Sequence, residues 1–395
     1  GFNEQDEARF IVERIEGWVD EGNTRRSSAI LYRSNAQSRV LEEALIRAQI
    51  PYRIYGGQRF YERLEIRNAL AYMRLLIRRS DDTALERVLN LPPRGIGNKT
   101  VEQLRDLARA RQVPLWQAIV IAQDEQLFTS RALKALAGFT ALVDELDSFT
   151  LELPLEELTE HVVARSGLVE YHRAEKGERG QARVENLEEL VSAAKTFVPD
   201  DTDAPTLQQF LDSAALDAGD AQADPHEDSV QLMTLHSAKG LEFPLVFLAG
   251  MEENLFPHRM SLDEPGRLEE ERRLCYVGIT RAMEKLVLTY AESRRLHGSE
   301  SYNIASRFVR ELPAELLNEV RLGAAVSRPL SSLSPTPSAA HLDSGVSLGQ
   351  RVMHQVFGEG VVTNFEGGGS NARVEVSFAE GSKWLVLQYA NLQPL

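Results

Sequence analysis

The sequence has 395 residues, 43% of them hydrophobic, and its 44 basic against 59 acidic side chains give a net charge of −15. This length predicts about two to four globular domains. No apolar run approaches the roughly 18 residues that a membrane-spanning helix needs, so we expect no membrane contact. The acidic balance argues against a simple basic nucleic-acid-binding module. Any DNA contact must therefore come from local groups of residues.

The cysteine content limits the function classes further. Cys275 is the only cysteine, which excludes a disulfide framework and a cysteine metal site and fits a reducing cytoplasm. We therefore expect a cytoplasmic protein, with no metal site in this chain. Cys275 lies on the apolar stripe of a predicted helix, which favours packing in a core. The chain begins with Gly1 rather than methionine, and we expect it to be part of a longer protein.

The first part of the chain alternates between helix and strand patterns. Residues 4–21 have helical periodicity, and 29–32 form a short apolar run that is typical of a buried strand. Residues 38–49 predict a second helix, and a short strand over 51–54 follows. This alternation predicts an α/β layer with a parallel sheet. The apolar face of the first helix is expected to contain Ala8, Ile11, Val12, Ile15 and Val19.

The middle of the chain, from about residue 60 to 223, has the pattern of helices alone. Strand patterns return at 230–235, 245–249 and 286–290, and a helix is expected over 267–282. Because neither flank has enough strands for a stable parallel sheet, we predict that both contribute to one sheet. The acidic stretch over 200–228 is expected to be rich in turns. The helices of the insertion are predicted over 62–79, 82–89, 99–111, 114–122, 130–148, 155–165 and 183–197.

The last part of the chain changes composition twice. Residues 323–345 are rich in Ser, Pro and Ala and predict a flexible linker. The final 50 residues contain short strand patterns with Gly turns, which indicate a small antiparallel barrel. The predicted domain boundaries are 1–57 and 224–312 for the α/β domain, 58–223 for the helical insertion, 313–345 for the linker and 346–395 for the barrel.

One segment with concentrated polar chemistry is VQLMTLHSAKGLEFPLVFLAGMEENLFP (230–257). Its pattern is strand, polar turn, strand. Polar groups at the end of a parallel strand lie where open α/β sheets bind ligands. The side chains in this turn that can bind a ligand are Thr234, His236, Ser237, Lys239 and Glu242.

A second segment, EERRLCYVGITRAMEKLVLTYAESRRLHG (270–298), predicts a helix with one apolar stripe. Arg281 is expected at the edge of that stripe. There its guanidinium could pair with Glu270 or Glu284, or it could reach a neighbouring site.

These two segments resemble motifs V and VI of the UvrD/Rep/PcrA DNA helicases of superfamily 1. AILYRSNAQSR (29–39) resembles motif IV, and YGGQRFYERLEI (55–66) resembles the segment where that family enters its helical insertion. The resemblance extends over residues 4–395. It implies a RecA-like second motor domain, interrupted by an all-helical insertion and followed by a small SH3/Tudor-like β-barrel.

The resemblance implies four nucleotide contacts. Tyr32 would stack on adenine, Arg33 would contact the γ-phosphate, Glu242 would approach the ribose and phosphates, and Arg281 would be the arginine finger. A positioned guanidinium stabilises the charge that phosphoryl transfer spreads over the γ-phosphoryl oxygens. Arg33 and Arg281 are therefore expected to converge at the rim of one sheet. The alternatives are a strand-edge tyrosine, a surface cation at Arg33 and an indirect hydrogen-bonding role for Glu242.

The resemblance also implies contacts with single-stranded DNA from Thr234 and His236, although His236 could be an ordinary turn residue. In ESRRLHGSES (292–301) the chain leaves a strand and turns at Gly298. The family places a strand-separation hairpin there, with an aromatic tip that stacks on the first base pair. The matching position here is His297, whose imidazole offers less stacking surface.

The segment PPRGIGNKT (92–100) lies between two predicted helices, as in a helix-hairpin-helix. Gly95 and Gly97 would let backbone N–H groups approach a phosphate, and Arg94, Lys99 and Thr100 flank them. Such a hairpin binds duplex DNA without reading its sequence, and in the family the insertion contacts the duplex ahead of the fork. A tight turn between helices is the alternative. The segment is not a P-loop, because asparagine precedes its lysine.

A weaker basic signal lies in EYHRAEKGERGQARVENLEEL (170–190). It is either a second duplex contact or a solvated charged loop. The cations concerned are Arg173, Lys176, Arg179 and Arg183.

The C-terminal segment resembles the Tudor-like domain of the same helicases. We expect Phe357, Trp384 and Tyr389 to lie mostly in its core. The absence of an evident basic groove favours docking to a protein rather than to DNA. The resemblance suggests RNA polymerase or repair proteins as partners.

The 395 residues contain neither a Walker A loop nor the acidic box that holds Mg²⁺ in this family. ATP and Mg²⁺ would thus be held mostly by another domain, and we expect no ATP hydrolysis by this chain alone. The intact protein would be an ATP-dependent 3′–5′ DNA helicase in DNA repair and replication, acting on single strands and duplex junctions. A non-catalytic DNA- and protein-binding module is the alternative. A helicase–nuclease subunit is disfavoured, because no paired acidic nuclease signature is present.

Overall fold

The computed structural model describes residues 1–175, 177–200, 204–219, 227–262, 266–296, 299–320, 351–354, 357–366, 373–378, 381–386 and 392–394. The chain forms two compact units, residues 1–329 and 330–395. Among the described residues, no helix has the length and apolar character to cross a membrane.

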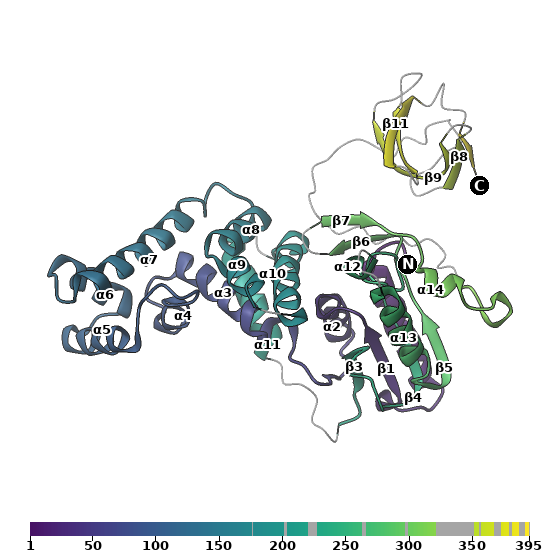
Figure 1. Ribbon diagram of the computed structural model, residues 1–395, viewed down its shortest axis with the longest axis horizontal. Coiled ribbons are helices and arrows are strands. Elements are labelled where there is room, and N and C mark those ends of the chain that lie inside the picture. The colour runs from purple at the N-terminus through teal and green to yellow at the C-terminus, as the bar shows by residue number, and fades with distance from the viewer. Residues whose placement is uncertain are drawn as a thin grey trace. The chain divides into compact units, whose positions relative to one another are not determined.

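Five parallel strands form the central sheet in the order β2-β3-β1-β4-β5 (Figure 1). β3 and β4 follow the insertion in sequence, yet they pair on either side of β1, which precedes it. Ile30 of β1 has Leu232 and Phe247 as its partners. The prediction that both flanks build one parallel sheet is therefore confirmed. The strands are β1 (Ser28–Tyr32), β2 (Tyr52–Ile54), β3 (Val230–Thr234), β4 (Phe243–Leu248) and β5 (Ala282–Leu288).

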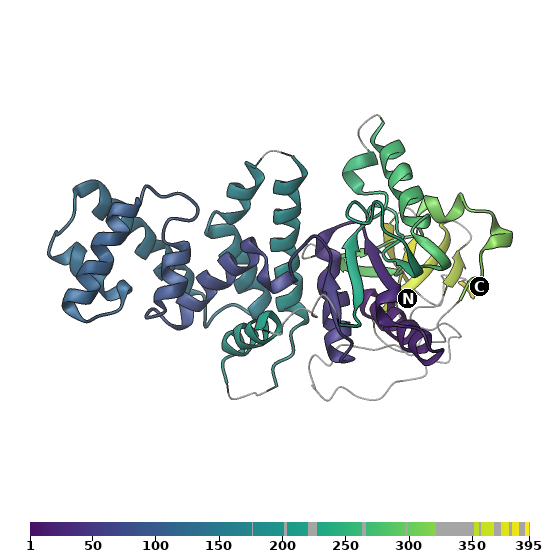
Figure 2. The same cartoon turned by 90° about the horizontal axis from the view of Figure 1, so that it is seen from below.

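Helices cover both faces of this sheet. Successive side chains of a strand point to opposite faces, so each buried strand contributes apolar side chains to the packing on both sides. Ile30 and Tyr32 pack with α1 and α2, whereas Leu31 packs with α13 and α14. Figure 2 shows the purple helices of the N-terminal segment and the green α13 on opposite sides of the sheet. The α1 face buries Trp18 where Val19 was expected. The helices of this layer are α1 (Glu4–Asp20), α2 (Ser38–Arg47), α12 (Arg259–Leu262), α13 (Arg267–Ile279) and α14 (Arg307–Arg310), with short η1 (Arg25–Ser27), η2 (Asn35–Gln37) and η4 (Ala314–Leu316).

The described part of the insertion is helical and has a core of its own. Two helices, α9 and α11, were not predicted, and α11 lies in the stretch that was expected to be rich in turns. Its apolar residues Leu207, Phe210, Leu211 and Ala214 recur at helical spacing and join the insertion core. The elements are η3 (Phe60–Glu62), α3 (Leu64–Ile77), α4 (Asp82–Val88), α5 (Asn98–Arg111), α6 (Leu115–Asp124), α7 (Ser130–Ser148), α8 (Leu155–Arg165), α9 (Leu168–Arg173), α10 (Glu178–Thr196) and α11 (Thr206–Gly219).

The second unit contains a five-stranded antiparallel sheet in the order β11-β10-β9-β8-β12. Phe357 packs against its small apolar core, and the His354 ring stacks on Phe357 with 4.7 Å between centroids. The side chain of Trp384 and the whole of Tyr389 lie outside the described residues, as does most of the predicted linker. The strands are β8 (Arg351–His354), β9 (Gly358–Glu366), β10 (Arg373–Phe378), β11 (Gly381–Val386) and β12 (Gln393–Pro394).

Candidate functional site

A pocket of about 440 Å³ lies where the β3–β4 connection meets α13, at the carboxyl ends of the parallel strands. Arg33 follows β1 at this edge, and His236 and Lys239 belong to the connection. All three line the pocket. Both residues of the connection are exposed. The pocket thus has cationic groups from two different strand ends.

Arg33 is held firmly in this pocket. Its Nε donates to both carboxylate oxygens of Glu271 at 3.0 Å, and its Nη2 donates to Oε1 at 2.8 Å. Burial by itself would raise the pKa of Glu271, but the hydrogen bonds and charge of Arg33, with the His258 backbone N–H at 3.0 Å, hold it below its usual range. The charge of Arg33 is thus largely neutralised by a buried carboxylate.

The turn after β3 is organised by Thr234. Its Oγ1 lies 3.0 Å from Oγ of Ser237 and also accepts from the Ser237 backbone N–H at 3.3 Å. A Cβ on Gly56, which has a φ of +72°, would lie 3.4 Å from the same Ser237 oxygen. The segment after β2 therefore lies beside this turn at the carboxyl edge.

Tyr32 does not lie in the pocket. Its side chain is 1% exposed and packs in the core under α1 and α2, and burial raises its pKa above the usual value. The expected stacking on adenine requires an exposed ring face. The structure offers none, because Tyr32 falls on the core side of the strand alternation.

Arg281 and Glu242 lie at the opposite, amino edge of the sheet, directly before β5 and β4. The guanidinium of Arg281 donates from Nε to the Val277 carbonyl and from Nη1 to the Leu241 carbonyl, both at 2.9 Å, and from Nη2 to Oγ1 of Thr280 at 3.0 Å. Glu242 is exposed. The Arg281 side chain is therefore oriented by neutral acceptors, which leave its positive charge intact.

The structure does not bring Arg33 and Arg281 together as expected. Phe243 pairs with Ala282 and lies two residues before Leu245, whose partner on β1 is Ser28. Arg33 lies five residues after Ser28. At ~3.3 Å per residue, these eight residues correspond to roughly 25 Å along the strands between the two arginines. Arg281 is also not among the pocket residues.

Arg94 of the predicted helix-hairpin-helix is turned inward. Its Nη1 donates to the carbonyls of Pro92 at 3.0 Å and Val88 at 3.3 Å, and its Nη2 donates to the Ser166 carbonyl at 2.9 Å. This differs from the expected phosphate contact, because the guanidinium is occupied in joining the hairpin to the end of α8.

Most of the rest of the hairpin faces outward, whereas Ile96 is buried in the core of the insertion. Gly95 has a φ of +82°, which favours glycine, and Gly97 is the N-cap of α5 without a side-chain cap. Gly95, Gly97 and Lys99 are exposed, and Thr100 is half-buried. The backbone thus presents the first turn of a 14-residue helix to solvent, next to a lysine.

The basic segment over 170–190 is partly structural. Arg183 donates to Glu175 at 2.6 Å and lies 3.7 Å from a carboxylate oxygen of Glu65. Arg173 and Arg179 are exposed, and Lys176 lies outside the described residues.

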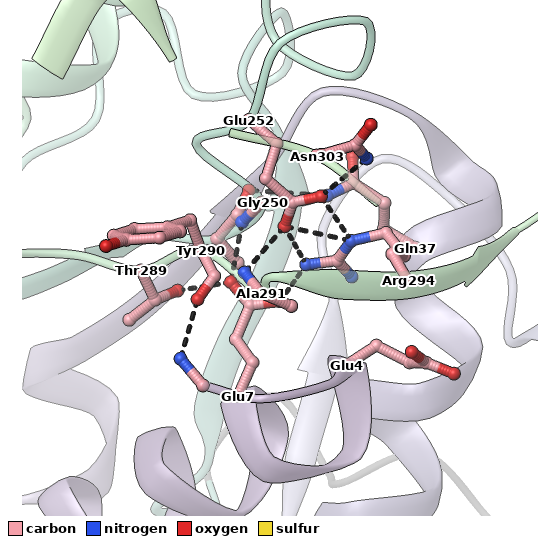
Figure 3. Close-up of polar contacts among 12 residues, drawn as sticks. Glu4, Glu7, Gln37, Gly250, Glu252, Thr289, Tyr290, Ala291, Arg294 and Asn303 are labelled. Atoms are coloured by element: carbon pink, nitrogen blue, oxygen red, sulfur yellow. Dashed lines mark hydrogen bonds and ion pairs between the residues drawn. The ribbon is translucent and has the colours of Figure 1, made fainter. Parts of the chain in front are cut away.

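Strands β6 (Ser293–Leu296) and β7 (Ser299–Tyr302) form the antiparallel hairpin expected from the sequence. His297, the predicted tip, lies outside the described residues. At the base of the hairpin, Arg294 is buried between Glu7 and Glu252 (Figure 3). This cluster was not predicted from the sequence. Its members come from three distant segments, and no local pattern marks them.

A second buried ion pair joins the insertion to the sheet layer. Arg39 of α2 donates from Nε to Oε1 of Glu189 on α10 at 2.7 Å, and Glu189 is fully buried. Nearby, Ser34 donates to Glu185 of the same helix at 2.8 Å. No role was predicted for these residues from the sequence.

Among the described residues, no group of three or more His, Cys, Asp and Glu side chains could hold a metal ion. Cys275 is buried, and burial raises the pKa of its thiol to about 12. The thiol is therefore a packing group rather than a nucleophile at neutral pH.

Known proteins resemble this chain over most of its length. The family model described as UvrD-like helicase C-terminal domain matches residues 1–293. DNA helicase II of Escherichia coli (strain K12) is 56% identical over 395 residues, which cover 99% of this chain and 55% of the relative. ATP-dependent DNA helicase PcrA of Bacillus subtilis (strain 168) is 38% identical over 417 residues, covering 100% of this chain and 56% of the relative. The chain thus spans about half the length of these relatives.

Proposed function

Because this chain belongs to the UvrD-like helicase C-terminal domain family, we propose that it is the C-terminal half of an ATP-dependent 3′–5′ DNA helicase in DNA repair and replication. The names of its relatives, DNA helicase II and ATP-dependent DNA helicase PcrA, support this proposal. The parallel sheet would be a RecA-like motor domain formed by 1–57 and 224–312. The insertion over 58–223 would bind the duplex.

The amino edge of the sheet is the proposed nucleotide side. The observation that carries this proposal is the hydrogen-bonding of Arg281, whose guanidinium is fixed by two carbonyls and a hydroxyl without being neutralised. A fixed, fully charged guanidinium is what the γ-phosphoryl group requires during transfer. Glu242, exposed beside Leu241, would approach the ribose. Mg²⁺ and the phosphates would be held mainly by a P-loop domain, since these 395 residues contain no P-loop.

The carboxyl edge is the proposed side for single-stranded DNA. His236 and Lys239 are exposed in the pocket, and Thr234 fixes the turn that carries them. We assign Arg33 to this side rather than to the γ-phosphate, because it lines the same pocket as His236 and Lys239, whereas Arg281 does not. Cationic side chains that follow a phosphate backbone bind DNA without regard to sequence.

The helix-hairpin-helix is the proposed duplex contact. Gly95, Gly97, Lys99 and Thr100 would offer backbone N–H groups, an ammonium and a hydroxyl to phosphates. Arg94 would instead support the hairpin from inside. The C-terminal sheet would close into an SH3/Tudor-like barrel that docks RNA polymerase or repair proteins.

The deciding experiment is Arg281→Ala in the full-length protein. We expect DNA-stimulated ATP hydrolysis to fall by about 10³–10⁵-fold, as for other arginine fingers, with affinity for single-stranded DNA unchanged. Arg272→Ala is the matched control, because Arg272 lies on α13, the helix that ends two residues before Arg281, but pairs with Glu269 and Glu311 at the surface. Normal ATP hydrolysis by the Arg281 variant would refute the nucleotide assignment. So would an equal loss in both variants.

A further inference from the structure

The β6–β7 hairpin has little support of its own. Its two strands pair only with each other among the described strands, over four residue pairs from Ser293↔Tyr302 to Leu296↔Ser299. An isolated two-stranded ribbon is marginally stable in water. Contacts at its base must therefore decide in which direction it projects.

The Glu252 carboxylate fastens both ends of the hairpin (Figure 3). Arg294, 5% exposed, donates from Nε to both of its oxygens at 3.0 Å. The backbone N–H of Ala291, before β6, donates to Oε1 at 2.8 Å, and Nδ2 of Asn303, after β7, donates to Oε2 at 3.0 Å. One fully buried carboxylate thus receives bonds from the chain entering the hairpin and the chain leaving it.

Glu7 connects this clamp to the parallel sheet. From the first turn of α1 it accepts from Arg294, from the Gly250 backbone N–H at 2.8 Å and from Oγ1 of Thr289 at 2.6 Å. Gly250 and Thr289 follow the carboxyl ends of β4 and β5. Burial by itself would raise the pKa of Glu7, but the positive charge of Arg294 and these hydrogen bonds lower it. Glu7 therefore acts as an anion that fixes the guanidinium.

The chemistry of the cluster indicates positioning rather than simple stability. Burying two carboxylates and one guanidinium is costly, and apolar side chains would often hold such a site equally well. A planar guanidinium between two carboxylates fixes an orientation as well as a distance. Arg294 binds both Glu7, on the sheet side, and Glu252, at the hairpin base.

We propose that Arg294 is a positioning residue for strand separation. Its bonds to Glu252 and Glu7 fix the direction in which the β6–β7 hairpin projects from the motor sheet, so that movement along one strand displaces the other. This inference rests on the proposed helicase function and on the strand-separation hairpin that the family resemblance implies for residues 292–301. It assigns a role that the nucleotide and DNA contacts above do not include.

The test compares two activities of the full-length protein, carrying Arg294→Met, Arg294→Lys or the milder Asn303→Ala. ATP hydrolysis stimulated by single-stranded DNA is expected to stay close to wild type. Duplex unwinding is expected to fall by up to about 10²-fold in Arg294→Met, as when a group is misplaced by about 1 Å. Lysine should restore part of it, because it keeps the charge but not the planar pair of donors.

Arg307→Gln is the matched control. Arg307 pairs with Glu253 at 2.8 Å just after the hairpin, outside the cluster, and both activities should stay normal. An equal fall of ATP hydrolysis and unwinding in the Arg294 variants would overturn the positioning role, and so would unchanged unwinding.

Amide hydrogen exchange distinguishes a failure of this inference from a failure of the proposed function. In Arg294→Met, residues 293–302 should exchange faster while β1 and β4 stay protected. Unchanged exchange over 293–302 would refute the anchor, even if the wild-type protein proved unable to unwind DNA. Faster exchange in a wild-type protein without helicase activity would retain the anchor and reject the proposed function.

Discussion

Arg33 and Arg281 lie at opposite ends of the parallel strands: Arg33 follows the carboxyl end of β1, and Arg281 precedes the amino end of β5. Arg33 is bound to the Glu271 carboxylate, and Arg281 is bound to the carbonyls of Val277 and Leu241. The two guanidiniums thus lie in different surroundings. One is part of a pocket at the carboxyl edge, and the other retains its full charge at the amino edge.

We therefore expect Arg33→Ala to weaken single-stranded DNA binding rather than nucleotide turnover. The slope of log K against log salt should become shallower by at most about 1, because Arg33 shares its charge with Glu271. ATP hydrolysis at saturating DNA should remain. Fluorescence anisotropy at several salt concentrations measures the slope.

Lys239→Ala is the control that separates a lost DNA contact from a loss of protein stability. Lys239 lines the same pocket and is exposed, whereas Arg33→Ala leaves the buried Glu271 without its partner. Both variants should lose DNA affinity, but only Arg33→Ala should lower Tm. A loss of ATP hydrolysis confined to Arg33→Ala would return this residue to the nucleotide site.

In the helix-hairpin-helix, one residue is expected to contribute to stability and another to duplex binding, so the two roles can be tested separately. Arg94→Ala removes three donor contacts to carbonyls and the cation that lies 5.7 Å from the ring centres of Tyr72 and Phe139. It should cost about 1–3 kcal/mol of unfolding free energy. Lys99→Ala should leave stability unchanged and weaken duplex binding. Urea denaturation and duplex affinity distinguish the two, and the reverse pattern would contradict our assignment.

The close packing of α13 on the β3–β4 connection predicts a position where even a methyl group is too large. A Cβ on Gly278 would lie 2.6 Å from Cδ2 of Leu235 and 3.1 Å from Cδ2 of Leu248, both buried. Gly278→Ala should therefore destabilise by about 1–3 kcal/mol through overpacking. Gly138→Ala, on an exposed face of α7 with open space around it, should instead stabilise by about 0.5–1 kcal/mol. Calorimetry of both variants measures the difference, and equal Tm shifts would refute it.

Glu189 predicts a pH dependence of stability. Burial raises its pKa from 4.5 to about 7, against the charge of Arg39, with Glu43 and Glu4 also raising it. The folded state therefore binds this proton more tightly than the unfolded state. Its contribution to stability is complete below about pH 4.5 and is lost as the pH rises through about 7.

Denaturation midpoints of wild type and Glu189→Gln at pH 5, 6, 7 and 8 test this sign. The wild type should lose stability relative to the variant as the pH rises across this interval. A constant difference between the two proteins would show that Glu189 does not titrate there.

The sequence by itself determined the elements and the layer type. Apolar runs such as 29–32 and 230–235 have the length and composition of buried strands, and the helical periodicity of the insertion is a property of neighbouring residues. The family motifs are equally local, so their presence was readable from the chain. The helix α11 was not predicted, because the acidic residues on both sides of it are typical of turns. Its apolar residues do recur at helical spacing, but the core that they pack against is known only from the structure.

Only the tertiary structure decided which residues share a site. β3 lies between β2 and β1, and this order places His236 in the same pocket as Arg33. Arg281 lies at the other end of the strands, because it precedes β5. The acceptor of Arg94 at Ser166 and the partners of Arg294 at Glu7 and Glu252 are distant in sequence. Hydrogen bonds and ion pairs depend on distances of about 3 Å in space, and residue type and spacing do not encode such distances across a fold.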